Sequence, residues 1–186
     1  MRKIILLAHI SLDGFVANSN KDLKDFPDGA ATLRFVCDLA KEADAALLGR
    51  VSYELLNDFW PSAKDSPNAT KDEIIFSNWY NAAQKIVLSK TITQNFANTI
   101  FINDNIADEI TKIKQQAGKA ILIFGSPTVS EQLMQLNLID SYWIFVNPVL
   151  FGSGLPLFSS SNKIKFKLLA VKQFSNDEVG LNYVVD

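Results

Sequence analysis

The sequence predicts an α/β fold, in which a mostly parallel sheet carries helices on both faces and ends in an antiparallel hairpin. Short apolar runs alternate with amphipathic stretches through most of the chain, as in successive βαβ units. The last two strand-like runs, residues 165–174 and 179–186, lie on either side of the turn sequence Ser175-Asn176-Asp177, which predicts the hairpin. Because no repeat or linker divides the 186 residues, we expect one domain covering residues 1–186.

The other predicted strands are runs with few polar interruptions, as is typical of strands buried on both faces. They lie at residues 3–10, 44–49, 85–89, 98–103, 119–125 and 141–152. The pair Asp13-Gly14 has turn chemistry, and the polar, irregular residues 15–30 after it predict a surface loop.

Amphipathic spacing predicts five helices between these strands. The first shows it most clearly, with apolar residues at Leu33, Val36, Cys37 and Ala40. The five ranges are residues 31–43, 51–59, 71–83, 106–118 and 128–137, with a proline-containing loop at 61–70. Thr128 and Glu131 have the spacing of a capping box at the start of the last helix.

Composition excludes several classes of function. The chain has 48% hydrophobic and 20% charged residues and a net charge of −2, so we expect a packed core and no binding of nucleic acid or anionic membranes. No apolar run approaches the ~20 residues of a membrane span. The run after Met1 is too short for a signal peptide, and the chain has one cysteine, so we expect a cytoplasmic protein.

Glycines, hydroxyls and cations follow three of the predicted parallel strands, at the edge where α/β sheets bind ligands. The three turns contain Gly49, Arg50, Val51 and Ser52; Ser89, Lys90 and Thr91; and Gly125, Ser126, Pro127 and Thr128. Glycine allows a close approach to the backbone, and the N-terminus of a helix favours phosphate. Two cations on this edge predict a ligand with several phosphates, and NADPH fits better than NADH. The alternative is that each turn is ordinary surface structure.

The order of the motifs SLDGFVA, LLGRVSYE, DFWP, KIVLSKT, ILIFGSPTVSEQLM and LIDSYWIFVNPVLFGSGLPLF resembles the dihydrofolate-reductase-like superfamily. The sequence is most similar to the reductase domain of the bacterial bifunctional deaminase-reductase of riboflavin synthesis and to its stand-alone relatives. The resemblance covers essentially the whole chain. It implies a sheet of eight strands and an NADPH-dependent reductase, nominally one acting on 5-amino-6-(5-phosphoribosylamino)uracil. A dihydrofolate reductase and a non-catalytic NADP-binding protein are the alternatives.

The resemblance also implies roles for individual residues. Cofactor contacts are expected from the three turns above together with Val129, while Ala8 and the loop around Gly14 cover the nicotinamide. The expected substrate-binding residues are Leu6, Phe35, Leu56, Trp60 and Phe124. Related reductase domains pair through the C-terminal region, so a homodimer is expected. The aromatic, apolar segment 141–152 and the edge of the following hairpin support this expectation.

Both known substrate signatures of the superfamily are missing. Dihydrofolate reductases carry a carboxylate early in the first helix, where this chain has Thr32. The riboflavin-pathway reductase carries a glutamate where this chain has Phe124, and the deaminase domain with its zinc motif is absent. A phenylalanine at this position predicts a flatter, less polar heteroaromatic substrate, because a polar group facing it would have no partner.

Single residues leave alternatives open. Asp13 is the candidate proton donor in the nicotinamide-side loop, or a turn residue that bonds its own backbone. His9 is either a general acid or a packed side chain, and Trp60 either contacts substrate or anchors the core. Cys37 is expected to be a core residue. No histidine–cysteine cluster predicts a metal, and no serine–histidine–aspartate pattern predicts hydrolysis.

Overall fold

The structure, a computed structural model, describes residues 1–27, 29–91, 97–159 and 163–186. Its strands are β1 (Ile4–Ile10), β2 (Phe15–Asn18), β3 (Ala43–Gly49), β4 (Gln84–Leu88), β5 (Thr99–Ile102), β6 (Ala120–Phe124), β7 (Ser141–Val146), β8 (Gly154–Pro156), β9 (Phe166–Gln173) and β10 (Val179–Val185). Its helices are α1 (Ala30–Lys41), α2 (Arg50–Ala63), α3 (Lys71–Ala82), α4 (Ile106–Gln115) and α5 (Pro127–Gln135).

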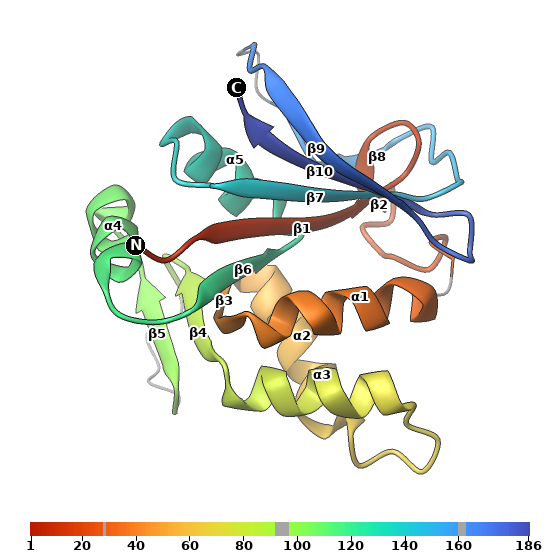
Figure 1. The fold of residues 1–186 in the computed structure, drawn as a ribbon, viewed down its shortest axis with the longest axis horizontal. Coiled ribbons are helices and arrows are strands. Elements are labelled where there is room, and N and C mark those ends of the chain that lie inside the picture. Colours follow the sequence, from red (N-terminus) through yellow and green to blue (C-terminus); the bar gives the residue numbers. More distant parts are fainter. Residues whose placement is uncertain (28, 92–96, 160–162) are drawn as a thin grey trace.

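Eight of the strands form one sheet in the order β5-β4-β3-β6-β1-β7-β10-β9 (Figure 1). The neighbours from β5 to β7 pair in parallel, whereas β10 pairs antiparallel with both β7 and β9. The predicted fold class, a mostly parallel eight-stranded sheet with a C-terminal antiparallel hairpin, is therefore confirmed. In the described part of the chain, no helix is long and apolar enough to cross a membrane.

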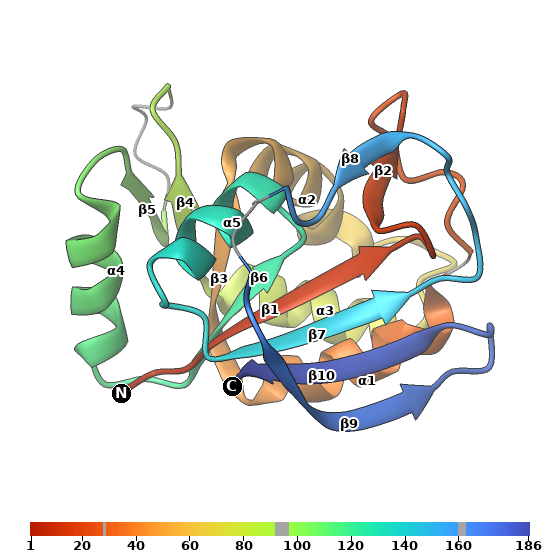
Figure 2. The same ribbon diagram turned by 90° about the horizontal axis from the view of Figure 1, so that it is seen from above.

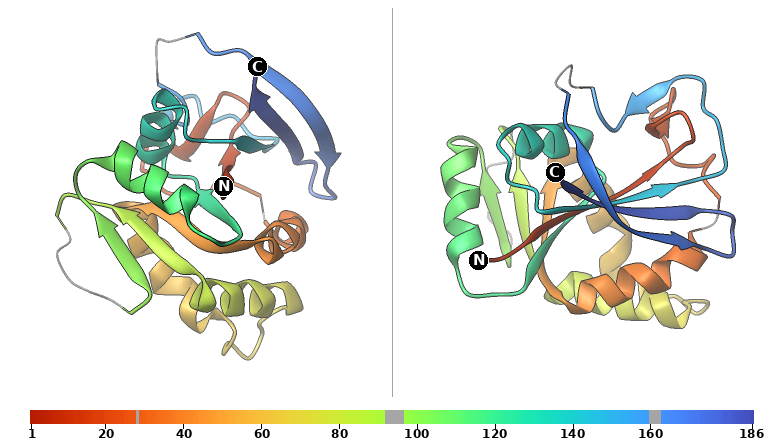
Figure 3. Two further views of the ribbon diagram at one scale, coloured as in Figure 1. Left: turned by 60° about the vertical axis from the view of Figure 1, so that its left-hand side comes forward. Right: turned by 45° about the horizontal axis from the view of Figure 1, so that its top comes forward.

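Helices cover both faces of the sheet, and the two faces have separate cores. On one face, helices α4 and α5 cover the side chains of Ile4 and Leu6 from β1. On the other, α1 and α3 cover Leu7, the residue after Leu6, because successive side chains of a strand point to opposite faces. Figure 3 shows α1, α2 and α3 on one side of the sheet and α4 and α5 on the other.

A second, two-stranded sheet was not predicted. The segment expected as a loop at residues 15–30 begins with β2, which pairs antiparallel with β8. These strands have four and three residues, too few to show a periodic pattern, and they come from distant parts of the sequence. Figure 2 shows this pair beyond the C-terminal ends of β1 and β7, where it closes one end of the molecule.

Two predictions about helix ends were wrong. The capping box at Thr128 does not form. Ser126 is the N-cap of α5 and adopts a left-handed φ of 52°, and no side chain caps this helix. The side chain of Glu131 instead accepts a hydrogen bond from Ser159 Oγ at 2.5 Å. A complete capping box is found at the start of α3, between Thr70 and Glu73.

Helix α2 continues through Pro61 into the segment predicted as loop. Its last turn is held by α3, since the Ser77 hydroxyl donates to the Trp60 carbonyl at 2.6 Å and the Asn81 amide donates to the Pro61 carbonyl at 3.0 Å. These contacts come from a different helix, so the local sequence gives no sign of them.

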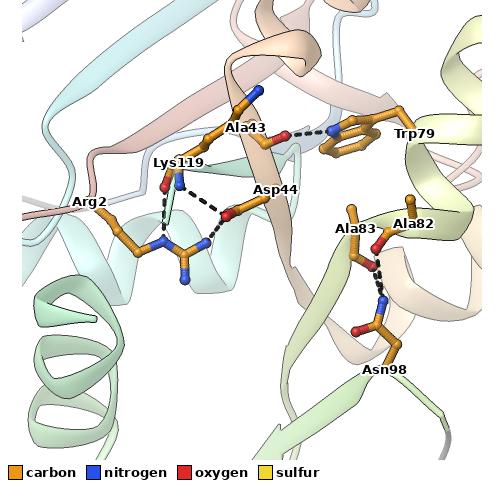
Figure 4. Close-up of polar contacts among 8 residues, drawn as sticks. All are labelled: Arg2, Ala43, Asp44, Trp79, Ala82, Ala83, Asn98 and Lys119. Carbon is orange, nitrogen blue, oxygen red and sulfur yellow. Dashed lines mark hydrogen bonds and ion pairs between the residues drawn. The ribbon is translucent and has the colours of Figure 1, made fainter. Parts of the chain in front are cut away.

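The N-terminal ends of the strands are fastened by side-chain hydrogen bonds (Figure 4). Arg2 donates from Nε to the Lys119 carbonyl at 2.8 Å and forms an ion pair with Asp44. Asn98 donates to the carbonyls of Ala82 and Ala83 at 3.0 and 2.9 Å. These contacts join the segments that enter β1, β3, β4, β5 and β6, at the edge opposite the one where α/β sheets generally bind ligands.

The two edge strands of the sheet are β5 and β9, and β9 is the one in the C-terminal hairpin. Its apolar side chains Leu168, Leu169 and Val171 are 47%, 54% and 60% exposed. By contrast, the aromatic strand β7 lies inside the sheet between β1 and β10, which accounts for its apolar sequence. The predicted edge is therefore supplied by the hairpin alone.

Candidate active site

The three turns predicted to bind the cofactor lie side by side. Strand β3 has β4 and β6 as its two neighbours, and all three strands run in parallel. The segments that leave β3, β4 and β6 therefore emerge at the same edge of the sheet. Gly49 pairs with Leu88, directly before Ser89, which places the first two turns at the same level.

Gly49 and Ser126 bring the turns after β3 and β6 into direct contact. The Gly49 amide donates a hydrogen bond to Ser126 Oγ at 3.1 Å. A Cβ atom on Gly49 would lie 2.5 Å from Ser126 Oγ and 3.2 Å from Val129 Cγ2. Glycine is thus required here by the close approach of the two turns, since its φ of −83° suits any residue.

The turn after β6 presents its backbone to open space. Gly125 and Ser126 have consecutive left-handed φ values of 55° and 52°. A Cβ atom on Gly125 would meet nothing within 4 Å, so this glycine is free on the side where a ligand would approach. The turn is held to α5 by the Ser130 hydroxyl, which donates to the Gly125 carbonyl at 2.9 Å.

The helices that begin at this edge, α2 and α5, have bare N-termini. Neither has a side-chain cap or an acidic residue in its first turn. Helix α3 has a capping box and two acids there, and α4 has two acids. The partial positive charge at the starts of α2 and α5 is therefore not balanced by their own first turns, which favours an anionic ligand.

The two predicted cations lie at this edge, and one already has a partner. Arg50 Nη1 donates to both carboxylate oxygens of Glu54 at 2.9 Å, and both side chains are about half exposed. Lys90 is exposed, beside Ser89, whose hydroxyl accepts from the Thr91 amide at 3.3 Å. The exposed Arg50–Glu54 pair contributes only ~0.3–0.5 kcal/mol, so a bound phosphate would compete with it easily.

The sheet opens between β1 and β6 at the same edge. The β1–β6 pairing ends at Leu7 and Phe124, whereas the β1–β7 pairing continues to Ile10 and Val146. The Leu7 carbonyl accepts from Gly125 on the β6 side, and the Ile10 carbonyl accepts from Asn147 on the β7 side. The backbone polar groups of successive residues in a strand point alternately to the two neighbouring strands. Those of His9 therefore point to the β6 side, as those of Leu7 do, and face the opening next to Gly125.

Ala8 and Asp13 are placed differently from expectation. The Ala8 side chain is fully buried in the core under α5. Asp13 accepts hydrogen bonds from Ser11 Oγ at 2.5 Å and from the amides of Phe151 and Gly152 at 3.2 and 2.7 Å. The bond from Ser11, followed by those two amides, lowers the pKa of Asp13. Asp13 therefore fastens the Gly14 loop to the segment before β8, and an ionised carboxylate cannot donate a proton.

Four of the five predicted substrate residues lie on one face of the sheet, and Leu6 does not. Phe35, Leu56, Trp60 and Phe124 all pack against the core beneath α1 and α3. Leu6 is 0% exposed and belongs to the core on the opposite face. It therefore cannot line one pocket with the other four, because adjacent residues of β1 alternate between faces.

Three of the remaining four, Phe35, Trp60 and Phe124, form part of an aromatic layer, and Leu56 packs against the same core. Phe124 packs against Phe76 and Trp79 of α3 with ring centroids 5.7 Å apart, and Trp60 packs against Phe76 at 4.4 Å. Phe35 contacts Trp143 at 4.8 Å. Each of the four predicted residues keeps some exposure. A flat apolar ring bound at this edge would pack against aromatic side chains.

The residue that sequence reasoning missed is Glu178, in the turn before β10. Its side chain is 0% exposed, and its Oε1 lies 2.6 Å from His9 Nδ1. Nothing in the local sequence distinguishes it from the exposed Asp177 beside it, because its ion-pair partner comes from β1. Sequence reasoning also missed Glu54 as the partner of Arg50, although the i, i+4 spacing of the two residues on a helix predicts such an ion pair.

Outside this edge, the described part of the chain has a hollow and the single cysteine but no metal site. A hollow of about 270 Å³ beside the β2–β8 pair is lined by Asn18, Ser19, Lys21, Gly154 and Leu155, none of them a predicted site residue. Cys37 is 1% exposed, and its burial raises the pKa of the thiol to about 11, as expected for a core residue. Among the described residues, no group of three histidine, cysteine or acidic side chains forms a metal site.

Comparison with known protein families agrees with this geometry. The family model of the RibD C-terminal domain matches residues 2–179. The chain belongs to the RibD C-terminal domain family. Within this family it is similar to two proteins of Bacillus subtilis (strain 168), both described only as uncharacterized. YyaP is 31% identical over 98% of this chain and 94% of its own length, and YwjB is 30% identical over 98% of both.

Solved structures of other proteins share the fold of this chain. A putative riboflavin biosynthesis protein from Shewanella sp. PV-4 matches with a TM-score of 0.75, 19% identity and coverage of 100% and 99% of the two chains. RibD of Acinetobacter baumannii matches over 58% of its chain and all of this one, with a TM-score of 0.74 and 18% identity. Dihydrofolate reductase of Enterococcus faecalis, complexed with NADP(H), matches with a TM-score of 0.66 and 13% identity over 99% and 96%.

Proposed function

We propose that this RibD-type domain is an NADPH-dependent reductase that transfers hydride to a small, flat heteroaromatic substrate. The observation that carries the proposal is the joined pair of bare helix N-termini at the ligand-binding edge of the sheet. The Gly49–Ser126 contact holds the starts of α2 and α5 together, and Gly125 leaves the space in front of them open. Such an arrangement suits a diphosphate.

The residues present fit a nicotinamide dinucleotide. The backbone of Gly125 and Ser126 and the first turn of α5 would hold the diphosphate, with the start of α2 beside it. Arg50 and Lys90 would bind the 2′-phosphate, and the hydroxyls of Ser89 and Thr91 would lie near the ribose. The opening between β1 and β6 would receive the nicotinamide, which supplies hydride when bound. The protein's own part is to bind, orient and exclude water.

The aromatic layer supports a flat, weakly polar substrate. RibD-type relatives include a Thermotoga maritima enzyme whose name includes 5-amino-6-(5-phosphoribosylamino)uracil reductase. We keep that reaction as the nominal one. Phe124, however, offers no acceptor, and its ring packs against Phe76 and Trp79. A polar substrate group facing it would remain unpaired, at a cost of ~1–3 kcal/mol.

The test combines binding with turnover. NADPH binding is followed by quenching of tryptophan fluorescence. NADPH oxidation is then measured at 340 nm with three probes: the phosphoribosylaminouracil, 7,8-dihydrofolate and 1,4-benzoquinone. We expect saturable binding and steady oxidation with at least one probe. Rapid turnover of dihydrofolate would instead assign a dihydrofolate reductase, and tight binding without any turnover would support a non-catalytic NADP-binding protein.

A further inference from the structure

The chain's single histidine pairs with a carboxylate that is sealed from solvent. His9 Nδ1 lies 2.6 Å from Glu178 Oε1, and the His9 side chain is 39% exposed whereas that of Glu178 is 0% exposed. An isolated carboxylate in such a place is strongly disfavoured, so its burial requires charged or hydrogen-bonding partners. The pair is therefore a contact between a partly exposed side chain at the end of β1 and a fully buried one.

The surroundings of Glu178 favour its ionised form. Burial acts to raise its pKa, but the His9 imidazole and the nearby Asn176 and Thr32 side chains outweigh burial and lower it. Asn176 Nδ2 lies 3.3 Å from Glu178 Oε2. Thr32, in the first turn of α1, has a side chain that is 1% exposed, and its hydroxyl donates to the Gly29 carbonyl at 3.0 Å. The carboxylate therefore contacts His9 of β1 and Asn176 of its own turn.

The His9 ring is fixed in orientation as well as paired. It stacks on the Phe145 ring with centroids 4.8 Å apart and an angle of 21° between the planes. Because Nδ1 faces an ionised carboxylate, that nitrogen carries hydrogen, and Nε2 is the nitrogen available to a ligand. Orientation by stacking and by a buried acceptor is the arrangement used to hold a proton-transferring imidazole.

His9 also occupies the right position on the sheet. It is two residues beyond Leu7, where the β1–β6 pairing ends, so it lies on the rim of the opening between these strands. Leu7 belongs to the core that Phe35, Trp60 and Phe124 pack against, and residues two apart on a strand share a face. His9 therefore lies on the face of the sheet that carries the aromatic layer.

We propose that His9 donates the proton that completes substrate reduction, and that Glu178 is the positioning residue that holds His9 for this step. The proposal rests on the reductase function proposed above. A hydride, with its two electrons, passes from reduced nicotinamide to the carbon of a C=N or C=O bond. The nitrogen or oxygen takes a proton from Nε2 of the imidazolium, and the neutral ring regains a proton from water. Asp13, which holds a loop, is not needed for this step.

Few other charges face the pair. Helix α1 contributes Arg34 and Asp38, which pair with Asp72 and Lys41 respectively. Strand β9 contributes Lys172, whose Nζ lies 4.3 Å above the Phe35 ring. Asp13 lies on the loop that follows β1. Strands β6 and β7 present aromatic rings on this face.

The first test needs neither cofactor nor substrate. With one histidine in the chain, ¹⁵N NMR of the imidazole reports His9 without ambiguity. We expect the neutral ring of the wild type to carry its hydrogen on Nδ1, and the Glu178→Met variant to shift towards the Nε2–H form. Glu42→Met, which changes an exposed glutamate just after the other end of α1, is the matched control and should leave the tautomer unchanged. A wild-type ring in the Nε2–H form would overturn the proposal without recourse to any variant.

The second test separates this proposal from the reductase proposal. His9→Gln should lower kcat by ~10²–10⁴-fold, the usual contribution of a general acid, and leave the NADPH dissociation constant within about twofold. His9→Gln should also change the pH profile of kcat, because the profile of the wild type reports its proton donor. Full activity of His9→Gln in an otherwise active reductase would refute the role of His9 alone. A wild type that neither binds NADPH nor oxidises it with any of the three probes would refute both proposals.

Discussion

Replacing Gly49 with alanine tests the contact that joins the two helix starts. The added Cβ would lie 2.5 Å from Ser126 Oγ, a distance that two such atoms do not adopt, and 3.2 Å from Val129 Cγ2. The Ser126 hydroxyl is able to rotate away, but it then loses the hydrogen bond from the Gly49 amide at 3.1 Å. The backbone at Gly49 is unstrained, so the destabilising part of the effect comes from this contact.

The size of the effect follows from these two terms. Leaving the part-buried Gly49 amide without a partner costs ~1–3 kcal/mol. Replacing glycine at a permissive φ contributes ~0.4–1 kcal/mol in the opposite direction, because alanine restricts the unfolded chain. We therefore expect Gly49→Ala to lower the free energy of unfolding by ~1–2 kcal/mol, which corresponds to ~2–4 °C in Tm per kcal/mol for a chain of this length. NADPH binding should weaken as well, because the starts of α2 and α5 are displaced.

A double-mutant cycle with Ser126→Ala isolates the contact. In the Ser126→Ala background the amide has already lost its acceptor and the short Cβ–Oγ approach no longer exists. Gly49→Ala should then change stability by less than ~0.5 kcal/mol, so the two substitutions should be clearly non-additive. Thermal and urea unfolding followed by circular dichroism measures all four proteins. An equal cost of Gly49→Ala in both backgrounds would refute the explanation of why residue 49 is glycine.

Three further predictions concern charge and assembly. Arg50→Ala should weaken NADPH binding ~10-fold or more, since a charge-assisted bond contributes ~1.5–3 kcal/mol, and it should leave NADH binding nearly unchanged. Glu54→Gln should tighten NADPH binding. Equal losses of NADPH and NADH affinity in titrations of Arg50→Ala would contradict the 2′-phosphate role. The pKa of Glu178 is lowered from 4.5 in the folded state, so its stabilising contribution is present above pH 4.5 and is lost as pH falls through the folded value. Urea unfolding of Glu178→Gln should show a smaller loss of stability on acidification than the wild type, and identical pH dependence would contradict this. We also propose a twofold homodimer through the exposed strand β9. Sedimentation should give a dimer at micromolar concentration, and Val171→Lys should dissociate it. A monomeric wild type would rule out the dimer.

The sequence was sufficient wherever the signal is local. The apolar runs located the eight strands of the main sheet, and the short turn at residues 175–177 predicted the hairpin. The shared position of the three turns after β3, β4 and β6 was predicted because it depends only on strand direction. Leu6 was an avoidable error. Alternation along a strand puts it on the opposite face from Leu7, and Leu7 pairs with Phe124.

The remaining features depend on contacts between distant segments. The extension of α2 through Pro61 requires side chains of α3, and the β2–β8 pair requires two short segments to meet. The spacing of Thr128 and Glu131 matched a capping box, but Pro127 and the left-handed Ser126 start the helix differently. Glu178 has no local signature at all, because its burial is produced by β1 and α1.

The central claim is that the joined turns after β3, β4 and β6 bind NADPH. The most direct measurement is a titration of the ¹⁵N-labelled protein with NADPH, and in parallel with NADH, followed by amide NMR shifts. The account predicts saturable binding with the largest shifts at the amides of Gly49, Ser126 and Lys90 and their neighbours, and about tenfold or more weaker binding of NADH. Shifts confined to the hollow beside β2 and β8, or no saturable binding of NADPH, would contradict it.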